Sequence, residues 1–263
     1  MGVLNVTPDS FSDGGQYLQS EDAITRAWQI AEEGADILDV GGESTRPGSG
    51  GVSADEELGR VLPVLDALAK NYPLPVSIDT SKAEVARAAL ERGASMVNDI
   101  TALRDNPELG KEVASRGAAL ILMHMRGTPA TMQRIPFSAD IMAELVAWAD
   151  EAVARAEKHG VSSNQIILDP GIGFGKTVSQ NLEILRNLPR LAESGFPLMV
   201  GSSRKSFIGS VLGSTGRDRI WGTGATVAAS IIFGAHVVRV HDVAAMRAVA
   251  RMADAIMDER STE

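Results

Sequence analysis

The 263-residue chain contains no cysteine, and aromatic residues make up only 4% of it. Without cysteine there is no disulfide and no thiolate chemistry, which agrees with a reducing compartment. The start, "MGVLNVTPDS", also lacks the basic segment of a signal peptide and carries few apolar residues before Pro8. We therefore expect a cytoplasmic protein.

Positive charge is scarce as well. The chain has 25 lysines and arginines against 34 acidic residues, a formal net charge of −9, and its basic residues form no runs. Nucleic acids and anionic membranes attract proteins with a positive face, so neither is expected as a partner. A small anionic substrate remains possible where a few cationic side chains converge.

Long charge-free stretches are few, and one of them could be read either as a membrane span or as buried secondary structure. Residues 220–238, "IWGTGATVAASIIFGAHVV", contain no Asp, Glu, Lys or Arg, as a membrane span would. Gly222, Gly224, Gly234 and His236 interrupt them, and the C-terminal part is β-branched. The pattern favours a buried helix followed by a strand.

Apolar, β-rich runs recur along the chain, each followed by a segment with helical periodicity. The expected strands lie at 2–7, 35–42, 75–80, 95–101, 118–125, 165–171, 197–203 and 236–243. The clearest helical segments lie at 21–34, 54–70, 83–93 and 139–159, with Ser20 and Ser81 as expected N-caps. Eight alternating units in one chain predict an α/β fold, a single-domain (β/α)₈ TIM barrel over residues 1–263. An open doubly wound sheet is the alternative, but no dinucleotide loop follows the first strand.

Polar residues gather where these strands end, which is where the active sites of such barrels lie. In strand order they are Asn5, the loop "DVGGESTRPG" (39–48), Asp79, Asn98 with Asp99, His124, Asp169, the segment 202–205, and Arg239 with His241. Strands buried on both faces should be nearly continuous hydrophobic runs. Polar residues at nearly every strand end therefore indicate a functional rim.

Each residue alone has a simpler interpretation. Asp79 is also placed to cap a helix, Asp169 to start a turn before Pro170, and His124 to be a hydrogen-bonded histidine of the rim. The loop at 39–48 is also compatible with an ordinary strand-to-helix connection. Arg239 and His241, two residues apart on one strand, point to the same face, and a barrel arginine needs a charged partner. An anionic ligand would be such a partner.

The segment "DPGIGFGKT" (169–177) superficially suggests nucleotide binding. It is one residue too short for a P-loop, because Pro170 stands where the first glycine should be. No zinc or calcium motif is present either, so any metal is expected to be a weakly held, oxygen-ligated ion such as Mg²⁺.

Taken together, the strand-end motifs resemble the dihydropteroate synthase family, the folate-pathway enzymes that sulfonamides block. The motifs are "LNVTPDSFSDGG" (4–15), "DVGGESTRPG" (39–48), "SIDT" (77–80), "VNDI" (97–100), "LMHMRGTP" (122–129), "DPGIGFGKT" (169–177), "GSSRKSFIG" (201–209) and "RVHDV" (239–243). The resemblance implies condensation of a 7,8-dihydropterin-6-methyl pyrophosphate with p-aminobenzoate, giving dihydropteroate and Mg²⁺-pyrophosphate. It also implies a homodimer through the last helices.

The resemblance further implies a role for individual residues. The pterin site would use Asp79, Asn98, Asp169, Lys205 and Phe174; the pyrophosphate site Thr45, Arg46, Arg239 and His241; the p-aminobenzoate site Phe11, Pro47, Arg204 and Ser206; and the Mg²⁺ site Asn5. Asp79, Lys205, Arg239 and His241 would be catalytic, with Asp79 stabilising positive charge that develops on the pterin. Asp79 has no evident cationic neighbour on its own strand.

The loops 7–15 and 42–51 are expected to form a glycine-hinged lid over the substrates. Arg239, His241 and a metal ion would stabilise the leaving pyrophosphate, and no general base is evident to activate the amine. The pattern therefore predicts an SN1-like reaction. Two alternatives remain: a pterin-dependent methyltransferase barrel, and a non-catalytic pterin-binding protein.

Overall fold

All eight predicted strands are present and pair in parallel. The computed structural model describes residues 1–7, 16–44, 50–132, 134–135, 137–213 and 219–258. The strands are β1 Gly2–Asn5, β2 Leu38–Gly41, β3 Val76–Asp79, β4 Met96–Asp99, β5 Ala119–Met123, β6 Ile166–Asp169, β7 Met199–Val200 and β8 Val237–Val238. β1 to β6 are hydrogen-bonded in chain order, and β7 pairs with β8.

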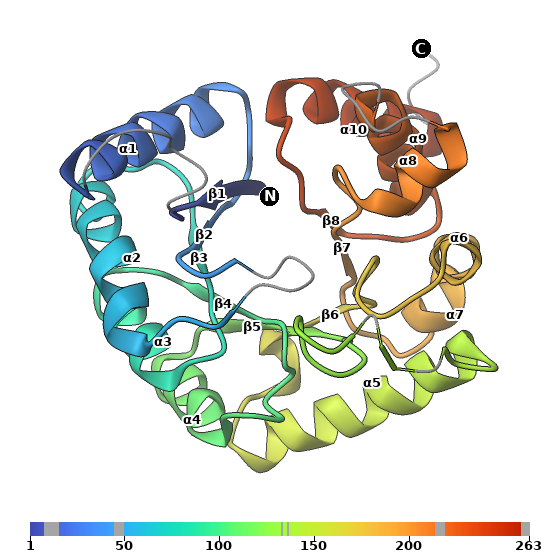
Figure 1. The fold of residues 1–263 in the computed structure, drawn as a ribbon, viewed down its shortest axis with the longest axis horizontal. Helices are drawn as coiled ribbons and strands as arrows, with labels where there is room; N and C mark the ends of the chain where they lie inside the picture. The colour runs from blue at the N-terminus through green and yellow to red at the C-terminus, as the bar shows by residue number, and fades with distance from the viewer. Residues whose placement is uncertain (8–15, 45–49, 133, 136, 214–218, 259–263) are drawn as a thin grey trace.

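Two parallel bridges, Leu168–Leu198 and Gly2–Val240, join these two sheets at both edges. The strands therefore close into a ring with the helices outside it (Figure 1), which confirms the (β/α)₈ barrel. β7 and β8 are shorter than predicted. The chain nevertheless stays paired beyond β8, because the Arg239 amide donates to the Val200 carbonyl and the Val240 amide to that of Met1.

The helices follow the strands as the periodicity predicts. They are α1 Gln16–Glu32, α2 Ala54–Leu68, α3 Ala83–Glu91, α4 Pro107–Arg116, α5 Ile141–Lys158, α6 Val178–Arg186, α7 Leu188–Ala192, α8 Ser206–Leu212, α9 Arg219–Ile232 and α10 Val243–Met257. The charge-free stretch 220–238 forms most of α9 and all of β8, as predicted. Within the described ranges, no helix combines the length and apolarity needed to cross a membrane.

Both predicted N-caps are wrong. Ser20 lies inside α1, which begins four residues earlier, and the N-cap of α3 is Lys82 rather than Ser81. At α3 the Thr80 hydroxyl accepts a hydrogen bond from the Lys82 amide at 3.2 Å, one position before the expected serine.

Apolar side chains of the described residues form three clusters, one of which, Met123, Met125, Met132 and Phe174, lies in and after β5 and in the β6–α6 loop. The largest cluster lies between the barrel and the helices, and another closes the floor of the barrel. The floor contains Met1, Ile37, Met96, Ile121, Ile167, Met199 and Val237. The terminal ammonium of Met1 donates to the Val238 carbonyl at 3.0 Å, which fixes the chain start within this floor. The polar site is built above this floor.

Candidate active site

A layer of four polar side chains lies directly above the apolar floor. Ile37, Met96, Ile167 and Val237 belong to β2, β4, β6 and β8 or the residue before them. Alternate residues of a strand point to the same side, and in such barrels alternate strands contribute the four members of a layer. Two residues further along, the same strands supply Asp39, Asn98, Asp169 and Arg239. Three predicted site residues thus come together with one that was not predicted.

Arg239 is the centre of this layer. Its Nε donates to Asp39 Oδ2 at 2.6 Å, and its Nη2 donates to Asp79 Oδ2 at 2.7 Å. The expectation that Arg239 needs a charged partner is therefore confirmed, but its partners are two carboxylates of the protein, and the cationic neighbour of Asp79 comes from a different strand. Both carboxylates lie far from Arg239 in the sequence, so closure of the barrel creates the pairing.

Asp39 is the functional residue that sequence reasoning missed. Its side chain is fully buried, and its Oδ2 also accepts a hydrogen bond from Asn98 Nδ2 at 3.3 Å. One signal was available: Asp39 stands in the middle of the apolar strand β2, where a charge is costly unless it has partners. It also lies two residues after Ile37, in phase with the other polar strand-end residues.

Burial shifts the protonation of this layer. Burial raises the pKa of Asp79 above its usual range, an effect that Arg239 opposes and Asp39 reinforces. Burial also raises the pKa of Asp169 to about 6, against hydrogen bonding from the Gly171 amide and the charge of Lys205. Burial would lower the pKa of Arg239, but Asp39 and Asp79 raise it above its usual value, so Arg239 stays protonated.

The β6–α6 loop places two more site residues. The Gly171 amide donates to Asp169 Oδ1 at 2.7 Å, and the ammonium of Lys205 lies 3.9 Å from the centre of the Phe174 ring. Burial and the nearby Arg239 lower the pKa of Lys205 to about 8. Lys205 and Phe174, both assigned to the pterin site, are therefore in contact, and the charge of Lys205 is close enough to Asp169 to lower its pKa.

The turn after β7 carries the other predicted residues of this region. Arg204 adopts a left-handed backbone conformation (φ 58°), which is uncommon for a residue with a side chain, and its guanidinium forms an ion pair with Asp242. Lys205 is the N-cap of α8, and the exposed Ser206 is the first residue of that helix. Arg204 and Ser206 are thus both presented to solvent at the rim.

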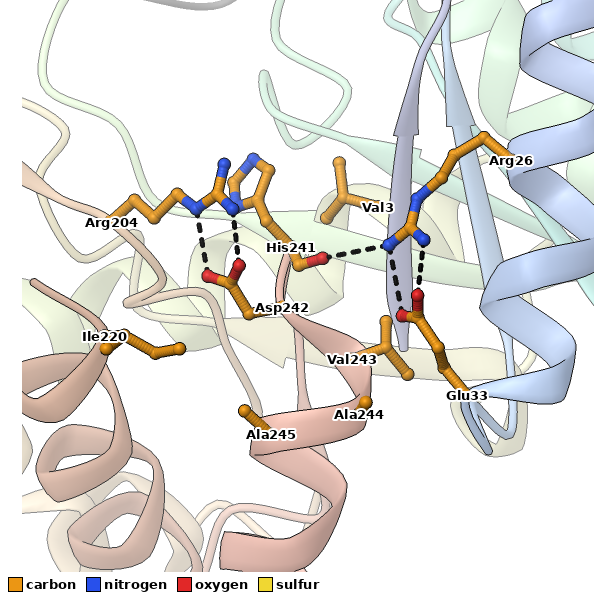
Figure 2. A pocket seen from close by; sticks show the side chains of 10 residues that line it. All are labelled: Val3, Arg26, Glu33, Arg204, Ile220, His241, Asp242, Val243, Ala244 and Ala245. Carbon is orange, nitrogen blue, oxygen red and sulfur yellow. Dashed lines mark hydrogen bonds and ion pairs between the residues drawn. The ribbon is translucent and has the colours of Figure 1, made fainter. Parts of the chain in front are cut away.

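A pocket of about 480 Å³ lies beside His241. Its lining residues are Val3, Arg26, Glu33, Arg204, Ile220, His241, Asp242, Val243, Ala244 and Ala245. Figure 2 shows His241 between the Arg204–Asp242 and Arg26–Glu33 ion pairs, with the first turn of α10 below it. Arg239 is not among the lining residues, so of the two residues assigned to the pyrophosphate on this strand only His241 borders the pocket.

The surroundings of His241 favour an anion. Burial and the charges of Arg239 and Arg204 lower the pKa of His241 to about 4, and its Nδ1 lies 3.1 Å from the Ser203 hydroxyl. Asp242, the N-cap of α10, bonds to Arg204 instead of capping the helix. A helix N-terminus without a side-chain cap offers backbone N–H groups to an anion.

His124 and Lys176 form a second buried polar group behind the β6–α6 loop. Lys176 Nζ donates to the carbonyls of His124, Gly171 and Phe174. Burial lowers the pKa of Lys176 to about 7 and that of His124 to about 2. His124 Nε2 lies 3.3 Å from Glu144 Oε1, and the buried Nδ1 has no hydrogen-bond partner in the described part of the chain, so the interpretation of His124 as a hydrogen-bonded rim histidine stays a prediction.

Four predicted site residues, Phe11, Thr45, Arg46 and Pro47, lie outside the described residues. The loop that contains the last three is anchored next to them, because Lys82 Nζ pairs with both Glu43 and the buried Glu57. Asn5, the predicted magnesium ligand, ends β1 opposite Gly41. Among the described residues, no group of three His, Cys, Asp or Glu side chains is placed to hold a metal ion.

The chain resembles known proteins over nearly its whole length. The sequence model of the family described as pterin binding enzyme matches residues 1–241. The dihydropteroate synthase of Synechocystis is 50% identical over 257 residues, which are 97% of this chain and 89% of that protein.

Solved structures agree with this match. The dihydropteroate synthase of Xanthomonas albilineans with 4-aminobenzoic acid is 43% identical with a TM-score of 0.91, covering 97% of this chain and 92% of that one. The same enzyme in complex with 7,8-dihydropteroate is 40% identical with a TM-score of 0.88, over the same shares of the two chains.

Proposed function

The chain belongs to the family of pterin-binding enzymes, and on that premise we propose that it carries out the dihydropteroate synthase reaction. It joins 6-hydroxymethyl-7,8-dihydropterin pyrophosphate to p-aminobenzoate and releases pyrophosphate and 7,8-dihydropteroate. The observation that carries this proposal is the full-length match to a synthase at 50% identity. The polar layer of Asp39, Asn98, Asp169 and Arg239 supplies groups that suit a flat, neutral heterocycle.

The pterin would bind against this layer. A carboxylate accepts two adjacent N–H groups in bidentate fashion, which suits Asp169 to the amino-pyrimidinone edge of the ring. Asn98 and Lys205 would hydrogen-bond to other ring heteroatoms, and Phe174 would pack on an apolar face.

The pyrophosphate would occupy the pocket beside His241. The uncapped first turn of α10 and the nearby Arg204 and Arg239 would favour an anion there. Thr45 and Arg46 would contribute from the neighbouring loop. Arg239 would act from the barrel layer through its charge, since it does not line the pocket.

Mg²⁺ would enter with the pyrophosphate. Magnesium is usually held by one or two protein oxygens together with substrate phosphates, and a rim amide such as Asn5 fits this pattern without a dedicated protein cage. When bound, the ion would supply neutralisation of the charge on the leaving group.

p-Aminobenzoate would bind at the outer edge of the rim, where Arg204 and Ser206 are exposed. The start of α8 and the Arg204 guanidinium both favour its carboxylate, and Phe11 and Pro47 would cover its ring. The exposed left-handed turn at Arg204 supports this role, because strained backbone tends to be retained at binding sites.

The charge balance around Arg239 supports an SN1-like mechanism. Two carboxyl groups, Asp39 and Asp79, face one guanidinium, so the cluster carries one net negative charge at a pH above the raised pKa of Asp79. This charge would stabilise a pterin cation formed as pyrophosphate leaves, before the weakly nucleophilic aryl amine attacks. Asp79, at the top of the cluster, would be the carboxylate nearest to that cation.

The last helices would form a homodimer interface. Their exposed apolar side chains are Val211, Leu212, Trp221, Ile232, Met252, Ile256 and Met257, from α8, α9 and α10. These helices lie side by side in Figure 1. The cytoplasmic location stays a prediction from the sequence.

The reaction is tested by incubating the protein with Mg²⁺ and both substrates and detecting dihydropteroate by mass spectrometry. A methyltransferase barrel or a pterin carrier would bind dihydropterin without forming this product. Omitting p-aminobenzoate and following oxygen-isotope scrambling in the pterin pyrophosphate tests the mechanism. Direct displacement would give no scrambling and a rate that rises steeply with the nucleophilicity of substituted anilines.

Asp169→Asn tests the pterin site. The variant should fold normally and lose tight binding of dihydropterin, because the amide replaces one acceptor of the paired N–H groups with a donor. In the unchanged protein, affinity should fall as the pH drops below about 6, where Asp169 becomes protonated. Calorimetry that finds equal dihydropterin affinity in a folded variant would contradict this assignment.

A further inference from the structure

Asp39 accepts hydrogen bonds from two other residues of the polar layer. Its fully buried Oδ2 accepts from Arg239 Nε at 2.6 Å and from Asn98 Nδ2 at 3.3 Å. The three residues come from β2, β4 and the end of β8. One carboxylate oxygen therefore connects two residues that the pterin and pyrophosphate sites require.

The contact with Asn98 determines which end of the amide faces Asp39. An ionised carboxylate accepts hydrogen bonds and donates none, so the amide must turn its NH₂ group towards it. The Asn98 carbonyl oxygen is then left as an acceptor. In the described part of the protein this oxygen is buried and has no hydrogen-bond partner.

A buried acceptor without a partner is unfavourable, and a ligand N–H placed against it would remove that cost. We infer that Asp39 is a positioning residue that fixes the Asn98 amide with its carbonyl oxygen towards the ligand, so that Asn98 recognises an N–H donor of the pterin ring. This inference rests on the proposed function for the identity of the ligand. It also assigns Asp39 a second task, the anchoring of Arg239.

Reciprocal substitution tests the orientation. Asn98→Asp places a second carboxylate against Asp39. Two ionised carboxylates have no hydrogen to share and repel each other, so residue 98 would lose its hydrogen bond to Asp39 and its orientation. Adding Asp39→Asn restores the pair in reverse, since the amide introduced at position 39 then donates to residue 98, which still offers an acceptor oxygen to the ligand. If Asn98 instead recognised the ring through its NH₂ group, no change at position 39 would return the lost donor.

The affinity for 6-hydroxymethyl-7,8-dihydropterin is measured by calorimetry at about pH 8, where isolated carboxyl groups are ionised. This probe lacks pyrophosphate, so any displacement of Arg239 has little influence on the readout. We expect Asn98→Asp to bind about tenfold more weakly than the unchanged protein, which corresponds to the loss of one hydrogen bond. The double variant should recover most of that loss.

Ser77→Ala is the matched control. Ser77 is fully buried, stands opposite Asp39 in the β2–β3 register, and its hydroxyl has no hydrogen-bond partner among the described residues. This substitution should leave affinity unchanged and should not rescue Asn98→Asp. The thermal midpoints of all variants are measured as well. A rise in midpoint reports relief of charge repulsion in the fold, whereas a rise in affinity reports recovery of ligand recognition.

The inference is overturned if the double variant binds no better than Asn98→Asp, even when its thermal midpoint recovers. Unchanged affinity in Asn98→Asp overturns it as well. Should that variant fail to fold, Asn98→Ala replaces it, and adding Asp39→Asn must then cause no further loss. Failure of the proposed function is distinct, because the unchanged protein would then form no dihydropteroate.

Discussion

Arg239 illustrates how a single residue serves both fold and chemistry. It neutralises part of the charge of two buried carboxylates before any substrate arrives, at 2.6 and 2.7 Å. Removing one partner of a buried ion pair is more damaging than replacing the whole pair by apolar side chains, because the desolvation of the remaining charge is then uncompensated. The residue proposed to serve the leaving group is therefore also a stability determinant.

Arg239→Ala should reduce the free energy of unfolding by about 3–5 kcal/mol, because Asp39 and Asp79 would be left facing each other. His241→Ala should change it by less than about 1 kcal/mol, since His241 is half-buried and its Nδ1 contacts only the Ser203 hydroxyl. Urea unfolding of both variants measures the difference. Equal stability of the two variants would mean that the Arg239 ion pairs contribute nothing net to folding.

His124 gives a prediction about pH. Burial lowers its pKa to about 2 in the folded chain, whereas in the unfolded chain it returns towards its ordinary value of 6.5. Between these values the unfolded state binds more protons, so stability falls as the pH falls, by up to about 1.4 kcal/mol per pH unit from this residue. His124→Gln should lose less stability than the unchanged protein between pH 7 and pH 5.

Urea unfolding at the two pH values measures the effect, and His159→Gln, at the C-terminus of α5, is the control. The control should keep the pH dependence of the unchanged protein. If His124→Gln has the same pH dependence too, the imidazole of His124 is not held neutral by the fold.

At the scale of elements, the loop between β6 and α6 contains three glycines with positive φ, and Gly171 has the tightest surroundings of the three. Gly171 has φ +65°, and a Cβ there would lie 1.9 Å from the His124 carbonyl oxygen. The Gly171 amide is also the donor that orients Asp169. The close approach of β5 and this loop is therefore part of how the pterin site is built.

Gly171→Ala should destabilise the protein by more than about 3 kcal/mol, because the clash with backbone adds to the cost of a left-handed alanine. Dihydropterin affinity should fall with it. Gly195→Ala is the matched control, with φ +80° but nothing within 4 Å, and should cost only about 1–2 kcal/mol. Similar losses in both variants would show that the loop relaxes around the new methyl group.

Helix starts show what local sequence leaves open. Ser20 and Ser81 have the right chemistry for N-caps, yet α1 starts at Gln16 and α3 starts after Lys82. Lys82 is held by ion pairs to Glu43 and Glu57, from the β2–α2 loop and α2. Lys82, which precedes the first residue of α3, is thus held by tertiary contacts. The cap-forming chemistry of Ser81 alone does not determine where this helix begins.

For the whole molecule, the exposed apolar face of α8 to α10 predicts assembly. Trp221 is 80% exposed and Met252 62%, which is unfavourable for large apolar side chains that remain in water. Trp221→Glu combined with Met252→Glu should convert a dimer into a monomer in analytical ultracentrifugation. Phe137→Glu, which removes a comparable exposed side chain outside these helices, should leave the assembly unchanged. A monomeric unchanged protein would refute the interface.

The sequence by itself determined the number of strands, their parallel order and most residues of the rim. Strand and helix periodicities are local properties, and parallel strands that alternate with helices close into a barrel whose strand ends meet at one rim. Asp169, Asn98 and Lys205 could be assigned to that rim because each follows a recognisable apolar run.

Only the tertiary structure decided which side chains meet inside the barrel. Arg239 pairs with Asp39 and Asp79, which precede it by 200 and 160 residues, and of Arg239 and His241 only His241 lines the pocket beside α10. Spacing along one strand fixes the face on which a side chain lies. Contacts across the barrel depend instead on the stagger between strands, which is set by closure of the whole ring.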